Sequence, residues 1–206
     1  MTGLSLETDT LIEVAALVTD ADLNVLGDGV DVVIKPPQAA LDQMDDFVRE
    51  MHTRSGLLPL LADGLTLDEA QAVVLDYVRA HVPEAGKAPL AGNTVGTDRM
   101  FLARDLPALE SHLHYRNVDV SSVKELARRW FPRVYYNSPE KVGNHRALSD
   151  IAESIEELRY YREALFVAAP GPTTEGLKAI AAKHQAVLTS QLTGAVTLRE
   201  PTSPSE

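Results

Sequence analysis

The stretch LIEVAALVTDADLNVLGDGVDVVIK, residues 11–35, decides the fold class. Residues 11–19 are apolar with one conspicuous interruption, the carboxylate of Glu13, and residues 25–35 roughly alternate between apolar and polar. Between them, residues 20–24 have the Asp and Asn content of a turn. Two such runs joined by a short polar turn predict an antiparallel hairpin.

Helical patterns and one further strand follow the hairpin. Apolar spacing predicts one helix across Leu41 to Met51, and a Thr66–Glu69 capping box predicts a second helix that runs to about His81. Further expected elements are a helix from near Asp98, a strand at 117–120, a helix capped by Ser122, a loop at 131–144, and helices at 150–166 and 175–188. This order predicts an α/β domain in which helices flank a mixed β-sheet.

The composition excludes several classes of protein. A net charge of -11 argues against binding to long nucleic acid, whose affinity depends on neutralising many phosphates. No apolar run approaches the roughly 20 residues of a membrane span. There is no cysteine and no visible secretory signal, so we expect a cytoplasmic protein without disulfides.

Three stretches carry residues suited to chemistry. In GNTVGTDRMFLARDLP (92–107), Asp98 follows a glycine-rich turn; in NHRALSDIAESIEELRYYR (144–162), His145 precedes Asp150. A histidine beside a carboxylate can act as a general base near neutral pH. In LHYRNVDVSSVKELARRW (113–130), Arg116 and Ser121 flank a strand that runs into a helix, an arrangement suited to a phosphate. Taken singly, each of these residues is more commonly a helix cap or a surface side chain than a catalytic or binding residue.

Together with LIEVAALVTD and MDDFVREMHTRSGL, these stretches resemble oligoribonucleases of the DEDDh family of 3′-to-5′ exonucleases. The resemblance runs from residue 1 to about Phe166. It implies a ribonuclease-H-like exonuclease domain at residues 1–169, and leaves residues 170–206 as an extension with a short helix and a disordered tail.

The resemblance also implies a two-metal mechanism. Asp98 and Asp150 match two of the family's four acidic ligands for two Mg²⁺ or Mn²⁺ ions, and His145 matches its general base. Hard divalent cations prefer such oxygen ligands, and a metal pair can activate water and stabilise the leaving oxygen. The product would be a 5′-mononucleotide.

The substrate implied by the family is RNA of about two to five nucleotides, including dinucleotides. Three residues match its nucleotide pocket: Leu4, Phe47 (a Trp in most of the family) and His52. Three others match the groups that cap the 5′ phosphate: Thr94, Arg116 and Ser121. Tyr115 matches a tyrosine that enters the neighbouring subunit's site, so a homodimer is implied.

The resemblance raises a question about Met1. In the family, M-T-G-L directly follows a D-x-E strand that is central in the sheet and carries the other two metal ligands. We expect Met1 to be an internal methionine of that motif; otherwise the chain is a truncated form, unstable and nearly inactive.

Two other functions remain open. A related DEDDh nuclease would trim DNA or longer RNA ends. A chain without D-x-E would bind dinucleotides without cutting them.

Overall fold

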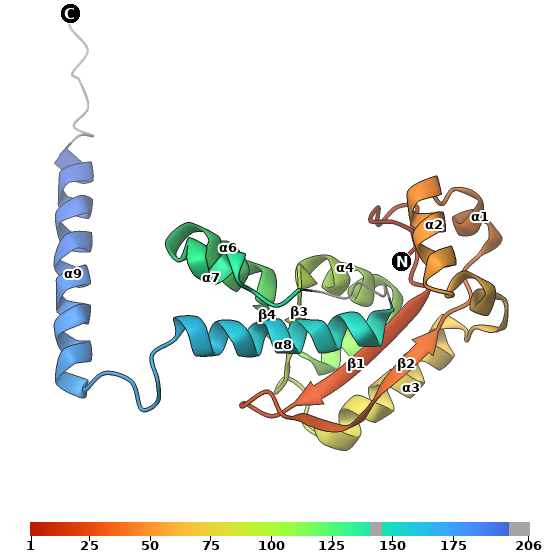
Figure 1. Cartoon of the computed structure of the whole chain (residues 1–206), viewed down its shortest axis with the longest axis horizontal. Coiled ribbons are helices and arrows are strands. Elements are labelled where there is room, and N and C mark those ends of the chain that lie inside the picture. Colours follow the sequence, from red (N-terminus) through yellow and green to blue (C-terminus); the bar gives the residue numbers. More distant parts are fainter. Residues whose placement is uncertain (141–145, 198–206) are drawn as a thin grey trace, which may run out of the picture. The chain divides into compact units, whose positions relative to one another are not determined.

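The computed structural model describes residues 1–140 and 146–197, which fall into two compact units, Met1–Leu165 and Phe166–Glu206. The first unit holds every strand of the described ranges and all helices but one (Figure 1). The expected α/β class is confirmed.

The predicted hairpin is present as β1 (Glu13–Thr19) and β2 (Val25–Val33). The strands are antiparallel, with Glu13 opposite Val33 and Thr19 opposite Val25, and the register shifts between Ala16 and Val18. A second pair, β3 (Pro89–Gly92) and β4 (His114–Asp119), is parallel. The described strands thus form two small sheets, one antiparallel and one parallel, instead of the single mixed sheet predicted from the sequence.

The two strand pairs are separate. Within residues 1–140 and 146–197, β1 pairs with β2 alone and β3 pairs with β4 alone. Each of β1 and β3 thus has one edge without a strand partner, and a strand edge presents a row of backbone N–H and C=O groups. Both strands line the same cavity, which is described below.

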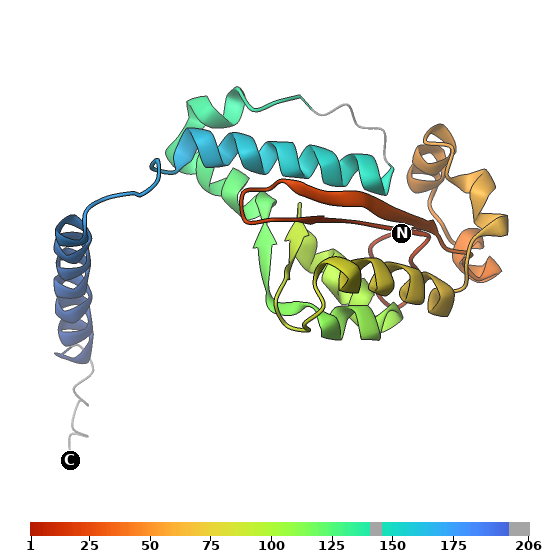
Figure 2. The same ribbon diagram turned by 90° about the horizontal axis from the view of Figure 1, so that it is seen from below.

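Helices cover both faces of the hairpin. Figure 2 shows α8 (Ala147–Leu165) on one face and α3 (Leu67–His81) on the other, and both helices contact β1 and β2. The predicted capping box of α3 is confirmed: the Thr66 side chain accepts from the Glu69 amide, and the Glu69 side chain accepts from the Thr66 amide. Such reciprocal bonds satisfy two amides that the helix leaves unpaired.

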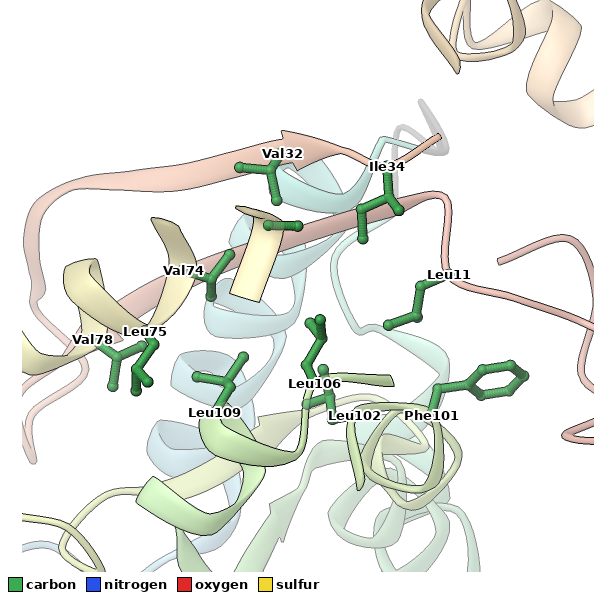
Figure 3. Packing of buried hydrophobic residues seen from close by; sticks show 11 residues of the cluster. Leu11, Val32, Ile34, Val74, Leu75, Val78, Phe101, Leu102, Leu106 and Leu109 are labelled. Carbon is green, nitrogen blue, oxygen red and sulfur yellow. The ribbon is translucent and has the colours of Figure 1, made fainter. Parts of the chain in front are cut away.

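The main core lies between the hairpin, α3, α4 (Val95–Asp105) and α5 (Pro107–His112) (Figure 3). Its buried members are Leu11, Val32, Ile34, Ala70, Val74, Leu75, Val78, Phe101, Leu102, Leu106 and Leu109. Burial of each of the larger side chains stabilises the fold by about 1.5–3 kcal/mol. This packing holds α4, and with it Asp98, against the hairpin.

The structure corrects the predicted helix across residues 41–51. Two helices stand there, α1 (Gln38–Asp42) and α2 (Asp46–Arg54), and a short 3₁₀ helix, η1 (Leu58–Asp63), follows. Asp45 accepts a hydrogen bond from the Val48 amide and so starts α2 as a separate helix.

Other helix starts also differ from the predictions. α4 begins at Val95, after Thr94 in the left-handed region at φ 55°, so Asp98 lies inside its first turn rather than capping it. α6 (Val120–Trp130) is capped by Asp119 and not by Ser122. α7 (Pro132–Tyr136) lies where a loop was expected. α8 begins at Ala147, three residues before Asp150, which therefore is not its cap.

The second unit contains α9 (Thr174–Thr197), which extends beyond the predicted 175–188. Three of its large apolar residues are more than half exposed: Leu177, Ile180 and Leu192. Neither this helix nor any other in the described ranges is long and apolar enough to cross a membrane.

Candidate active site

A cavity of about 810 Å³ is lined by β1 and β3, which do not pair with each other within residues 1–140 and 146–197. Consecutive residues of both strands line it, residues 13–15 from β1 and residues 90–92 from β3. Further lining comes from α2, α4 and α8, from the N-terminal segment that includes Leu4, and from Leu11, Leu57 and Asn93. The cavity therefore collects residues from five elements that are distant in the sequence.

Asp98 and Asp150 both line this cavity. Each lies in the first turn of its helix, α4 and α8 respectively, where the helix dipole favours negative charge. Burial raises the pKa of Asp98 above its usual value, although the Asp98 backbone amide and the Met1 amino group act in the opposite direction. The Asp98 carboxylate is thus poorly solvated, and a bound cation would stabilise its charged form.

The two carboxylates fit a divalent cation, since Mg²⁺ and Mn²⁺ prefer hard oxygen ligands. They supply only part of a site: within residues 1–140 and 146–197, no three acidic or histidine side chains are arranged to hold a metal ion. A metal pair would need further ligands beside Asp98 and Asp150.

Leu4 and His52, two of the residues predicted to form a nucleotide pocket, line the same cavity. Leu4 is 73% exposed, whereas His52 is buried and its Nε2 lies 3.0 Å from the Met1 carbonyl oxygen. Phe47 lies on α2 with its side chain 77% exposed, and it is outside the cavity lining.

The segment that carries Leu4 is fixed by a polar network. The Thr2 hydroxyl donates to Asp9 Oδ1 at 2.9 Å and accepts from the Thr10 amide at 3.0 Å. The Asp9 carboxylate leaves no room for a side chain at Gly3, because a Cβ there would lie 2.4 Å from Asp9 Oδ2. A side chain at Gly3 would therefore displace the Asp9 carboxylate from its bond to Thr2 and disturb the segment that carries Leu4.

Thr94 and Ser121 come together just beyond the C-terminal end of β3, at the starts of α4 and α6. Their hydroxyl oxygens lie 3.1 Å apart. Asp119 Oδ1 accepts from both backbone amides, at 2.9 Å from Thr94 and 3.1 Å from Ser121. Two hydroxyls beside the N-terminus of an eleven-residue helix are suited to bind a phosphate.

Asn93 connects this pair of hydroxyls to α8. Its Oδ1 accepts from the Ser121 hydroxyl at 3.1 Å, and its Nδ2 donates to Ser154 Oγ at 2.8 Å. Ser154 in turn donates to the Asp150 carbonyl oxygen at 2.7 Å. The sequence motifs predict no role for Asn93; its place beside Thr94 in the glycine-rich turn is the available signal.

Tyr115 and Arg116 lie on β4, outside the cavity lining. The Tyr115 ring is 74% exposed and stacks on His114, and the Arg116 guanidinium lies 5.3 Å from the Tyr115 ring centre. The structure thus brings together Leu4, His52, Asp98 and Asp150 in the cavity, and Thr94 with Ser121. His145, the expected general base, falls outside the described residues.

The profile of the RNase T family, described as an exonuclease family, matches residues 1–158. This chain belongs to the exonuclease family. It is similar to the oligoribonuclease of Streptomyces avermitilis, with 72% identity over 184 residues that cover 89% of this chain and 92% of that protein. The oligoribonuclease of Streptomyces coelicolor is 69% identical over the same coverage. The oligoribonuclease of Cutibacterium acnes is 68% identical over 92% of this chain and 94% of its own length.

Membership of this exonuclease family confirms the expected fold class and the expected kind of enzyme, a hydrolase of phosphodiester bonds. The matched region contains both Asp98 and Asp150 and every residue that lines the cavity. It ends inside α8, so α9 lies beyond it.

Proposed function

We propose that this protein is a 3′-to-5′ exoribonuclease that degrades RNA of about two to five nucleotides, including dinucleotides, to 5′-mononucleotides. One observation carries the proposal: Asp98 and Asp150 share a cavity with Leu4 and His52. The cavity thus combines acidic groups for a cation with groups that contact a nucleotide.

Asp98 and Asp150 would hold Mg²⁺ or Mn²⁺, two ions in each site. When bound, such a pair supplies charge stabilisation for the attacking and leaving oxygens. Other residues of the chain bind the substrate and move the proton: Leu4 packs against a base, His52 closes the pocket, and His145 takes the proton of the attacking water. His145 must be neutral to accept this proton.

A separate group of residues would set the length of the substrate. Thr94 and Ser121 offer paired hydroxyls at the N-terminus of α6, and Arg116 lies on the strand that leads to it. Bonds from these residues to a terminal 5′ phosphate leave no room for a longer strand beyond it. A short RNA also needs few phosphate contacts, which agrees with the net charge of -11.

We also propose that the protein acts in the cytoplasm as a homodimer. Leu126 and Trp130 lie four positions apart on α6, so they share a face of this helix, and they are 42% and 66% exposed. Phe131 follows and is 49% exposed, and Tyr115 is exposed on β4. Apolar groups of this size on a surface are typical of contact sites. A Tyr115 from the partner would then reach the neighbouring site.

A second candidate function follows from the strand edges of β1 and β3. If the remaining metal ligands belong to a D-x-E strand in the cavity, residues 1–206 alone would bind a dinucleotide without cutting it. The assay therefore compares this chain with a version that carries such a strand in front of Met1.

The test is the rate of hydrolysis of two-mers and of twenty-mers of RNA, with Mn²⁺ present. The proposed function predicts that the version with D-x-E cleaves two-mers much faster than twenty-mers. Equal rates on both would instead support a nuclease of longer ends. Calorimetry with a dinucleotide completes the test, since binding without turnover in both versions would support a binding protein.

A further inference from the structure

Besides Asp98 and Asp150, two further acidic residues line the cavity, Glu13 and Glu153, and the proposed function uses neither. Glu13 is the interruption in the apolar run of β1, and its side chain is only 6% exposed. A buried carboxylate is costly unless it is paired and hydrogen-bonded. Its position beside Asp98 and Asp150 would suit a metal ligand, so its contacts must decide its role.

Both oxygens of the Glu13 carboxylate are engaged by the start of α8. Oε1 accepts from Arg146 Nε at 2.6 Å, and Oε2 accepts from the backbone amide of Ala147 at 3.1 Å. Ala147 is the first residue of α8, and its amide is one that a helix cannot satisfy within itself. Glu13 therefore acts as a cap that is 134 positions away in the sequence.

The turn that Glu13 holds also contains Asp150. The Asp150 amide donates to the Arg146 carbonyl oxygen at 3.0 Å, which closes the first turn of α8. The other end of the same turn is held by Ser154, which donates to the Asp150 carbonyl oxygen. Arg146 is further held by Asp31 of β2, with Nη2 and Oδ2 3.6 Å apart.

We infer that Glu13 is a positioning residue, which fixes the first turn of α8 on β1 and thereby sets the direction of the Asp150 carboxylate. This inference rests on the proposed function for the role of Asp150. The strand gives the turn a rigid support, because β1 is paired with β2 and packed between α3 and α8. A ligand on a helix end without such support would sample several directions.

The first experiment measures hydrogen exchange of the 147–154 amides in residues 1–206, for wild type, Glu13→Gln and Arg146→Met. Arg146→Met breaks the pair from its more exposed side, so it remains informative if Glu13→Gln does not fold. Glu156→Gln is the matched control, because it removes a carboxylate of the same helix that pairs with Arg159 at the surface. We expect the 147–154 amides to exchange faster in Glu13→Gln and Arg146→Met than in wild type. Their exchange in Glu156→Gln should equal that of wild type.

The second experiment follows paramagnetic broadening of the Asp98 and Asp150 amide signals by Mn²⁺. We expect Glu13→Gln to raise the Mn²⁺ concentration needed to broaden the Asp150 signal by about 10–100-fold, the usual effect of losing a group that orients a metal ligand. If Glu13 were itself a ligand, the Mn²⁺ response would weaken while exchange in α8 stayed slow.

Unchanged exchange in both test variants would overturn the inference, and so would faster exchange with an unchanged Mn²⁺ response at Asp150. If the proposed function itself were wrong, Mn²⁺ would broaden neither the Asp98 nor the Asp150 signal in the wild-type protein. In that case no ligand remains for Glu13 to position, and the inference fails with it.

Discussion

The hydroxyl oxygens of Thr94 and Ser121 lie 3.1 Å apart, although the residues are 27 positions apart in the sequence. Asp119 holds both residues by their backbone amides, and Asn93 holds the Ser121 hydroxyl. A pair that is fixed from two sides is preorganised, and preorganised donors bind a phosphate at a lower entropic cost.

Ser121→Ala should therefore weaken binding of 5′-phosphorylated dinucleotides. Loss of one hydrogen bond to a charged group costs about 1.5–3 kcal/mol, which corresponds to a rise in KM of roughly 10–100-fold with kcat nearly unchanged. Steady-state kinetics on dinucleotides with and without the 5′ phosphate measure this effect.

Ser122→Ala is the control, since Ser122 also bonds to Asp119 but does not contact Thr94. An equal rise in KM for the unphosphorylated dinucleotide would contradict the assignment of a phosphate site.

Asp98→Asn should separate activity from stability. Turnover should fall by more than about a hundredfold, because the lost cation contact supplies several kcal/mol of transition-state stabilisation. The metal-free thermal midpoint should not fall, because burial already disfavours the charged form of Asp98 and raises its pKa.

The control for this comparison is Asp68→Asn, an exposed carboxylate in the first turn of α3. It should leave turnover unchanged. A marked drop in the midpoint for Asp98→Asn without metal would show that Asp98 serves the fold instead.

Asp31 should make stability depend on pH in the opposite sense to a typical paired carboxylate. Burial, then repulsion by Glu13, raises its pKa above 3.8, and Arg146 only partly offsets this. The folded state thus favours the protonated form. This contribution is fully present below pH 3.8 and is lost as pH rises through the folded-state pKa.

Asp31→Asn has no carboxyl group to ionise, so it should not lose stability as pH rises. Its stability relative to wild type should therefore increase between pH 3.8 and the folded-state pKa of Asp31, and then level off. Urea unfolding at a series of pH values measures the difference. A relative stability that decreases with rising pH would mean that the Arg146 contact outweighs burial.

Trp130→Glu should reduce self-association. The charge would fall on the exposed face of α6 that Trp130 shares with Leu126. Light scattering after size-exclusion chromatography should give a dimer mass for wild type and a monomer mass for the variant at the same micromolar concentration.

Val73→Glu is a control for this prediction, since Val73 is an exposed apolar residue of α3. A dimer that persists in Trp130→Glu would place the contact on another face.

Local signals explain what the sequence could predict. The hairpin and the α3 capping box depend on neighbouring residues, and both stand where they were expected. The start of α8 was misplaced because its cap is Glu13, which no local pattern connects to Ala147. Asn93 was missed for the same reason: its partners Ser121 and Ser154 are 28 and 61 positions away. Shared family motifs located Asp98 and Asp150, but only the packed helices bring them to one cavity.

The most direct test of the account is metal removal and restoration in the version that carries the D-x-E strand. After chelation, hydrolysis of a 5′-phosphorylated dinucleotide should stop. It should return when Mn²⁺ is added, but not in Asp150→Asn. Turnover that continues without metal, or an Asp150→Asn variant that recovers full activity with Mn²⁺, would contradict the claim that these cavity carboxylates hold the catalytic cations.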